Sequence, residues 1–282
     1  MIKSQKFCAA YFKIITCLAV FLSMFIFNFI FPIEKSLFHF YSITNRAWCW
    51  CEFLILGLAV FYIFKIKTIN FKDLAISCLL GLVLIVFFDK DAGYIQIIAT
   101  TVCYYSACQI FRYYSKQDKY FDLDVKNNVK SFFKGCLYAI PFALINDLAI
   151  YLTYTNKQIN NFKIFSVFSV FSEAKSALSP GISEEVIFHF FLLAFVVDVF
   201  KGDIPKKKWA LSLTYLLTVV PHSLIHLPDV ILSNPSMALF QLVFTSVLFG
   251  FPMVWLVKNK NLQTSIGFHW GVDFFRFLFL PW

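Results

Sequence analysis

Charged residues are scarce in this sequence. Asp, Glu, Lys and Arg make up 15% of the 282 residues, and hydrophobic residues make up 60%. A soluble domain averages about 25% charged and about 45–50% apolar residues. The mean hydropathy is +0.72. A water-soluble fold cannot bury so much apolar surface, so the composition excludes a soluble globular protein and predicts an integral membrane protein.

The second half of the chain also lacks cysteine. All eight cysteines lie at or before Cys136, which excludes thiol chemistry from the C-terminal half. No GxSxG or HExxH sequence is present. These absences argue against a covalent serine enzyme and against the commonest zinc-protease motif. There is also no internal repeat, which argues against a transporter.

Long apolar runs dominate what is present. Nine runs are candidate spanning helices, at 8–31, 48–64, 74–88, 93–111, 132–153, 182–200, 209–227, 236–257 and 262–280. They predict an all-α fold, a polytopic transmembrane helical bundle of about 8–9 spanning helices. We divide it into N-terminal transmembrane helices, residues 1–155, and a C-terminal catalytic core, residues 156–282. Within the connecting segment we expect a turn at Pro180–Gly181.

The basic residues predict the orientation. The net charge is +9, and Lys and Arg are nearly three times as frequent in alternate loops, beginning with the N-terminus, as in the others. By the positive-inside rule the N-terminus is cytoplasmic. We therefore predict a multi-pass protein of a cell membrane. Its expected partners are the lipid bilayer and a membrane peptide or lipidated protein substrate, and not nucleic acid. The abundance of Phe, Ile and Lys indicates a bacterial gene.

Ionisable residues concentrate in the last four predicted spans. A charged group at membrane depth costs about 2.5–3.5 kcal/mol, so each is a candidate functional residue. Three spans carry pairs with a spacing of four: Glu185 and His189, His222 and His226, and His269 and Asp273, with Glu184 adjacent to the first pair. Residues four apart lie on one helix face. We expect the three polar faces to meet in one cluster.

Such a cluster supports hydrolysis by either of two routes. A carboxylate beside neutral imidazoles can act as a general base on water, and a second imidazole can stabilise an oxyanion. Alternatively, histidine and carboxylate groups can hold Zn²⁺ and activate bound water. The residues leave the cofactor open as Zn²⁺ or none.

The three motifs together resemble the CPBP family of intramembrane proteases, which includes the CAAX prenyl endopeptidases. That family has EExxxR, FxxxH and Hxxx(N/D) on successive helices, and the matching stretches are EEVIFH, HSLIH and HWGVD, within about residues 180–275. The resemblance implies that Glu184 activates water with His226. It implies that His269 and Asp273 position the water or stabilise the oxyanion, and that Glu185 supports this catalytic set.

Two residues depart from the family pattern. His189 stands where the family has Arg, and His222 stands where it has Phe. We regard both as supporting residues. The change at His189 puts the usual prenylated CAAX substrate in doubt, and the HxxxH pair that His222 completes can chelate a metal.

The predicted function is an intramembrane endopeptidase that hydrolyses membrane-associated or lipidated, CAAX-like peptides through a Glu/His-activated water. The alternative is a non-catalytic membrane immunity or regulatory protein on the same scaffold. A simpler interpretation of Glu184 and Glu185 is that they follow Ser183 at a helix start and complement the helix dipole.

Overall fold

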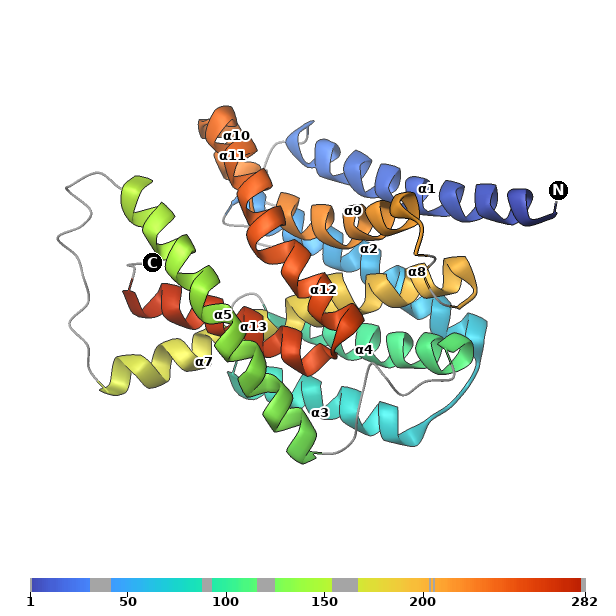
Figure 1. Ribbon diagram of the computed structural model, residues 1–282, viewed down its shortest axis with the longest axis horizontal. Coiled ribbons are helices and arrows are strands. Elements are labelled where there is room, and N and C mark those ends of the chain that lie inside the picture. Colours follow the sequence, from blue (N-terminus) through green and yellow to red (C-terminus); the bar gives the residue numbers. More distant parts are fainter. Residues whose placement is uncertain are drawn as a thin grey trace.

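The computed structural model describes residues 2–30, 42–87, 93–115, 125–153, 167–202, 204 and 206–279. All regular structure in these ranges is helical, and they contain no strand (Figure 1). The prediction of an all-α fold is therefore confirmed. Each of the nine predicted spans falls on a helix over nearly all of its described residues, the exceptions being residues 226–227, which follow the end of α9.

The helices begin and end close to the edges of the apolar runs. Their bounds are α1 Ile2–Ile30, α2 Ile43–Ile66, α3 Phe71–Phe87, α4 Gly93–Ser115, α5 Val125–Thr153, α7 Val167–Glu184, η2 Glu185–Phe191, α8 Leu192–Phe200, α9 Lys208–Ile225, α10 Pro228–Ser233, α11 Pro235–Thr245, η3 Ser246–Gly250, α12 Phe251–Asn259 and α13 Leu262–Phe279. The two η segments are π-helical.

Four described segments are long and apolar enough to cross a membrane. They are Cys8–Ile30, Ile43–Ile66, Lys126–Leu152 and Pro235–Asn259. The full count of 8–9 spans is therefore not confirmed. The other predicted spans are helical, and whether they cross the membrane stays a prediction. Two features explain why some of these helices are too short or too polar to be counted. The helix α3 has only 17 residues, and α7–η2, α9 and α13 carry the ionisable residues of the polar cluster.

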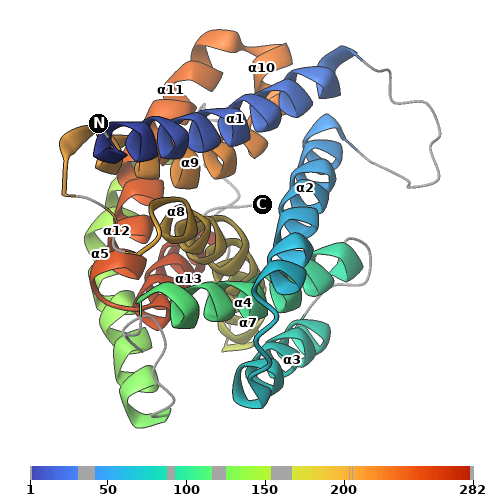
Figure 2. The same ribbon diagram turned by 90° about the vertical axis from the view of Figure 1, so that its right-hand side faces the viewer.

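One continuous helix, formed by α7, η2 and α8, lies at the centre of the bundle. In Figure 2 it is seen nearly end on, with α9 above its α8 part, α4 below that part and α2 to its right. The central segment η2 contacts all three of these helices. Every residue of η2 is buried. A helix that is apolar around most of its circumference must be enclosed by other helices or by lipid. The sequence VIFHFFLLAFVV has this character, and here other helices enclose it.

One local expectation for this helix and one alternative interpretation are wrong. The chain does not turn at Pro180–Gly181, because α7 continues through both residues. Gly181 packs against α13, where a Cβ atom would lie 3.3 Å from the Trp270 nitrogen, so tertiary packing overrides the local turn signal. Glu184 and Glu185 consequently lie in mid-helix, 7% and 0% exposed, and are not residues of a helix start.

The helices α5 and α13 approach each other at glycine. A Cβ atom on Gly135 would lie 2.1 Å from the Thr264 carbonyl oxygen, and one on Gly267 would lie 2.0 Å from the Phe132 carbonyl oxygen. Small residues allow helix backbones to approach this closely. The contact joins helices from both sides of the predicted boundary at residue 155, and the division into two domains stays a prediction.

Candidate active site

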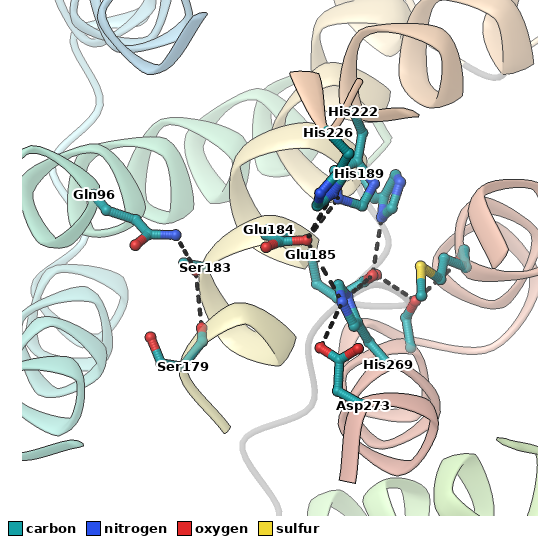
Figure 3. Close-up of polar contacts among 12 residues, drawn as sticks. Gln96, Ser179, Ser183, Glu184, Glu185, His189, His222, His226, His269 and Asp273 are labelled. Atoms are coloured by element: carbon teal, nitrogen blue, oxygen red, sulfur yellow. Dashed lines mark hydrogen bonds and ion pairs between the residues drawn. The ribbon is translucent and has the colours of Figure 1, made fainter. Parts of the chain in front are cut away.

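The seven predicted residues meet in one polar cluster (Figure 3). Three parts of the chain supply them: the junction of α7 with η2 supplies Glu184, Glu185 and His189, α9 and the residue after it supply His222 and His226, and α13 supplies His269 and Asp273. The side chains of six are at most 15% exposed, whereas that of His226 is 43% exposed. The cluster is therefore largely buried, and His226 is its most exposed member.

The carboxylate of Glu184 lies at the centre of three imidazoles. Its Oε2 atom is 2.6 Å from Nε2 of His222, 3.5 Å from Nε2 of His269 and 3.8 Å from Nε2 of His226. The family resemblance implied that Glu184 acts with His226, but the imidazole nearest to Glu184 is that of His222. Only 9% of the Glu184 side chain is exposed, so this carboxylate interacts chiefly with the protein and with any small molecule that enters the site.

Glu185 binds His269 from the other side of its ring and also contacts two residues that do not touch Glu184 Oε2. Its Oε1 atom lies 3.0 Å from Nδ1 of His189 and 3.0 Å from Nδ1 of His269. The Ser265 hydroxyl donates to its Oε2 atom and also lies 3.0 Å from the Met253 carbonyl oxygen. A carboxylate held by three donors is fixed in orientation, and it fixes the ring of His269 in turn.

His269 has a carboxylate on each side of its ring. With Nδ1 on Glu185, its Nε2 atom points toward Asp273 Oδ2 at 3.4 Å and Glu184 Oε2 at 3.5 Å. Carboxylate oxygens accept hydrogen bonds, so a ring with N–H on both nitrogens matches these surroundings. The Nε2–H group would then point into the space between Glu184 and Asp273.

His189, which stands at the position of the family's Arg, contacts Glu185 through Nδ1. Its Nε2 atom is buried and has no hydrogen-bond partner among the described residues. The His189 ring packs edge-on against His222, with ring centroids 5.0 Å apart. One imidazole thus supplies a single donor where a guanidinium offers several.

Some residues around the cluster were not predicted. Trp48 of α2 lies edge-on against His226, with ring centroids 4.9 Å apart, and Phe188 stacks on His222 at 5.3 Å. Ser265 precedes His269 by four residues, so the same spacing rule could have found it. No local signal points to Trp48, because it comes from a distant span.

Three side chains of the cluster have ligand atoms placed for a metal ion. These are Glu184, His222 and His226, whose ligand atoms all lie within 4.8 Å of one another. The arrangement as a whole offers a candidate general base in Glu184, a hydrogen-bond donor in His269 and a carboxylate, Glu185, that orients this donor. These are the groups that hydrolysis by activated water requires.

Comparison with known proteins agrees with this geometry. Residues 166–275, less than half of the chain, match the family described as type II CAAX prenyl endopeptidase Rce1-like. No curated protein and no solved structure gives a match. The matched segment contains all seven residues of the cluster. The predicted resemblance to the CPBP/CAAX protease family is thus confirmed for the segment that forms the site.

Proposed function

We propose that the protein is an intramembrane endopeptidase that hydrolyses peptide bonds of membrane-associated or lipidated, CAAX-like peptides. The observation that carries this proposal is the position of Glu184, whose Oε2 atom has three imidazole Nε2 atoms within 3.8 Å. The match of residues 166–275 to a prenyl endopeptidase family supports the same reaction class.

In this mechanism Glu184 is the general base. A water molecule beside Oε2 loses a proton to this carboxylate as its oxygen forms a bond to the scissile carbonyl carbon. His222 and His226 border the same oxygen and orient the water. The proton then passes from Glu184 to the departing amine nitrogen, the C–N bond breaks, and the products are a carboxylic acid and an amine.

His269 would stabilise the negative charge that develops on the carbonyl oxygen. Its Nε2–H group points into the space between Glu184 and Asp273 and is available to that oxygen. Donors held in place before the reaction stabilise an oxyanion without reorganisation. Glu185 acts as a positioning residue, because its contacts are with His189, Ser265 and His269.

The surroundings favour a substrate associated with the membrane. The partly exposed His226 and the ring of Trp48 lie together at the most exposed edge of the cluster. Four described helices are apolar enough to cross a membrane; Pro235–Asn259 lies within the matched segment, and the other three precede it in the same chain. A lipidated or apolar peptide would be concentrated in the same bilayer.

The test is cleavage of a peptide pool by the purified full-length protein in detergent. The pool contains prenylated CAAX peptides, unprenylated CAAX peptides and transmembrane peptides. We expect cleavage by the wild type and loss of cleavage in Glu184→Gln and His269→Ala. The matched control is Asp229→Asn, which changes an exposed carboxylate three residues after His226.

The outcome separates the catalytic proposal from a non-catalytic role. The assay is run both in metal-free buffer and with added Zn²⁺, so that the result does not depend on an ion. If the wild type cleaves no peptide under either condition, or if Glu184→Gln cleaves as well as Asp229→Asn, the hydrolase proposal is refuted.

A further inference from the structure

We propose that Glu184, His222 and His226 form a binding site for one divalent transition-metal ion, with Zn²⁺ as its preferred occupant. The site uses a histidine that the CPBP pattern does not contain, because His222 stands at the position of the family's Phe. The proposal concerns the same residues as the proposed function and deepens it. With an ion bound, Glu184, His222 and His226 would be its ligands, whereas the general-base route described above belongs to the metal-free site.

The donor set is suited to zinc. Two imidazole nitrogens and one carboxylate oxygen are common ligands of catalytic Zn²⁺, which binds three protein ligands and leaves a fourth position open. His222 and His226 are four residues apart at the end of α9, so both rings project from one helix face. Their Nε2 atoms face the same carboxylate oxygen, Glu184 Oε2 (Figure 3).

The separations fit a tetrahedral ion. Ligands at about 2.0–2.1 Å from a tetrahedral Zn²⁺ lie about 3.3–3.4 Å from one another. The two Nε2 atoms are 3.3 Å apart. The distances from Glu184 Oε2, 2.6 Å to His222 and 3.8 Å to His226, lie on either side of this value. A shift of the carboxylate by less than 1 Å would equalise them.

Hydrogen bonding alone leaves the three atoms poorly matched. If Nε2 of His222 donates its proton to Glu184, that nitrogen cannot also accept one from His226, since a protonated ring nitrogen has no free lone pair. A hydrogen bond can therefore join His222 Nε2 to Glu184 Oε2 or to His226 Nε2, but not to both at once. An ion at the centre would use a lone pair from each of the three atoms.

The surroundings favour a cation and allow it to enter. Three carboxylates, Glu184, Glu185 and Asp273, lie within the cluster, and a buried negative charge is stable only when it is paired or coordinates a metal. The side chain of His226 is 43% exposed, so an ion could reach this ligand from outside the protein. The fourth position would face His269, whose Nε2 atom lies 3.5 Å from Glu184 Oε2.

The experiment measures Zn²⁺ binding directly, with no peptide present. Full-length protein without a histidine tag is stripped with a chelator, returned to detergent buffer and titrated with Zn²⁺ against a fluorescent zinc indicator. We expect about one ion per chain. His222→Phe, which introduces the family's residue, should weaken the affinity at least about 100-fold, because loss of even an outer-shell partner costs about 10–100-fold.

Two further variants keep the result interpretable. His226→Gln removes a ligand at a partly exposed position, so it tests the site even if His222→Phe fails to fold, and it should weaken binding to a similar degree. Cys78→Ser removes an exposed thiol elsewhere and should leave the stoichiometry unchanged. Substitution with Co²⁺ should give the intense visible absorption of a four-coordinate ion.

A wild type that binds no Zn²⁺, or variants at His222 and His226 that bind as tightly as the wild type, would overturn the metal site. Neither result bears on peptide cleavage in metal-free buffer. Conversely, a protein that binds Zn²⁺ but cleaves no peptide would refute the hydrolase proposal and leave the metal site standing.

Discussion

Replacing Gly267 by alanine tests the helix contact that holds α13 in place. A Cβ atom at this position would lie 2.0 Å from the Phe132 carbonyl oxygen and 2.8 Å from its carbonyl carbon. Both atoms belong to the backbone of α5, so no side-chain rotation can relieve the overlap. The helices must separate by about 1 Å or more before the contact becomes an ordinary van der Waals distance.

The magnitude follows from the cost of overpacking. Forcing a methyl group into a close-packed interior costs about 1–3 kcal/mol. For a chain of this size, about 2–4 °C of melting temperature corresponds to each kcal/mol, so Gly267→Ala should melt about 2–12 °C below the wild type. Because α13 carries His269 and Asp273, the rate of peptide cleavage per folded molecule should also fall.

The assay is thermal unfolding in detergent, followed by peptide cleavage at a temperature where both proteins are folded. The matched control is Gly57→Ala in α2, where an added Cβ atom meets nothing within 4 Å. This change introduces a better helix former without a clash. If Gly267→Ala melts at the same temperature as Gly57→Ala and cleaves as fast, the close approach of α5 and α13 does not determine the geometry of the site.

Two further predictions concern buried polar groups. Asp198 is 1% exposed and accepts from Lys65 at 2.8 Å and Lys201 at 2.9 Å. Asp198→Asn removes the charge that pairs with both lysines and should lower stability by about 1–3 kcal/mol. This loss is smaller than for a fully buried ion pair, because both lysines are partly exposed. Thermal unfolding measures this loss, and an unchanged melting temperature would contradict it. His189→Leu removes a donor from Glu185 and should slow peptide cleavage about tenfold, equivalent to about 1.4 kcal/mol, through misorientation of His269. His189→Arg retains a donor and should retain more activity in the same assay; equal rates for the two variants would show that the Glu185 contact is unimportant.

The positions of the helices could be predicted from the sequence. The apolar run at residues 209–227 corresponds to α9, Lys208–Ile225, and the run at residues 48–64 lies within α2, Ile43–Ile66. Apolar runs mark helices because the backbone must satisfy its own hydrogen bonds wherever water is excluded. The prediction failed at Pro180, where packing of α7 against α13 overrides a local turn signal.

The members of the polar cluster could also be predicted. Ionisable residues within apolar spans are costly, and their spacing of four places each pair on one helix face. This reasoning selected His222, His226, His269 and Asp273, and the structure brings them together. It did not find Trp48, because no periodicity within α2 distinguishes a residue beside the site from one that contacts lipid.

The sequence by itself determined which residues are costly to bury and which helix faces they share. Only the tertiary structure decided which atoms meet. It places His222, not His226, nearest to Glu184, and it directs Glu185 toward His189 and His269. The physical reason is that spacing along a helix fixes a face, whereas the rotation and separation of neighbouring helices depend on packing at positions such as Gly135 and Gly267.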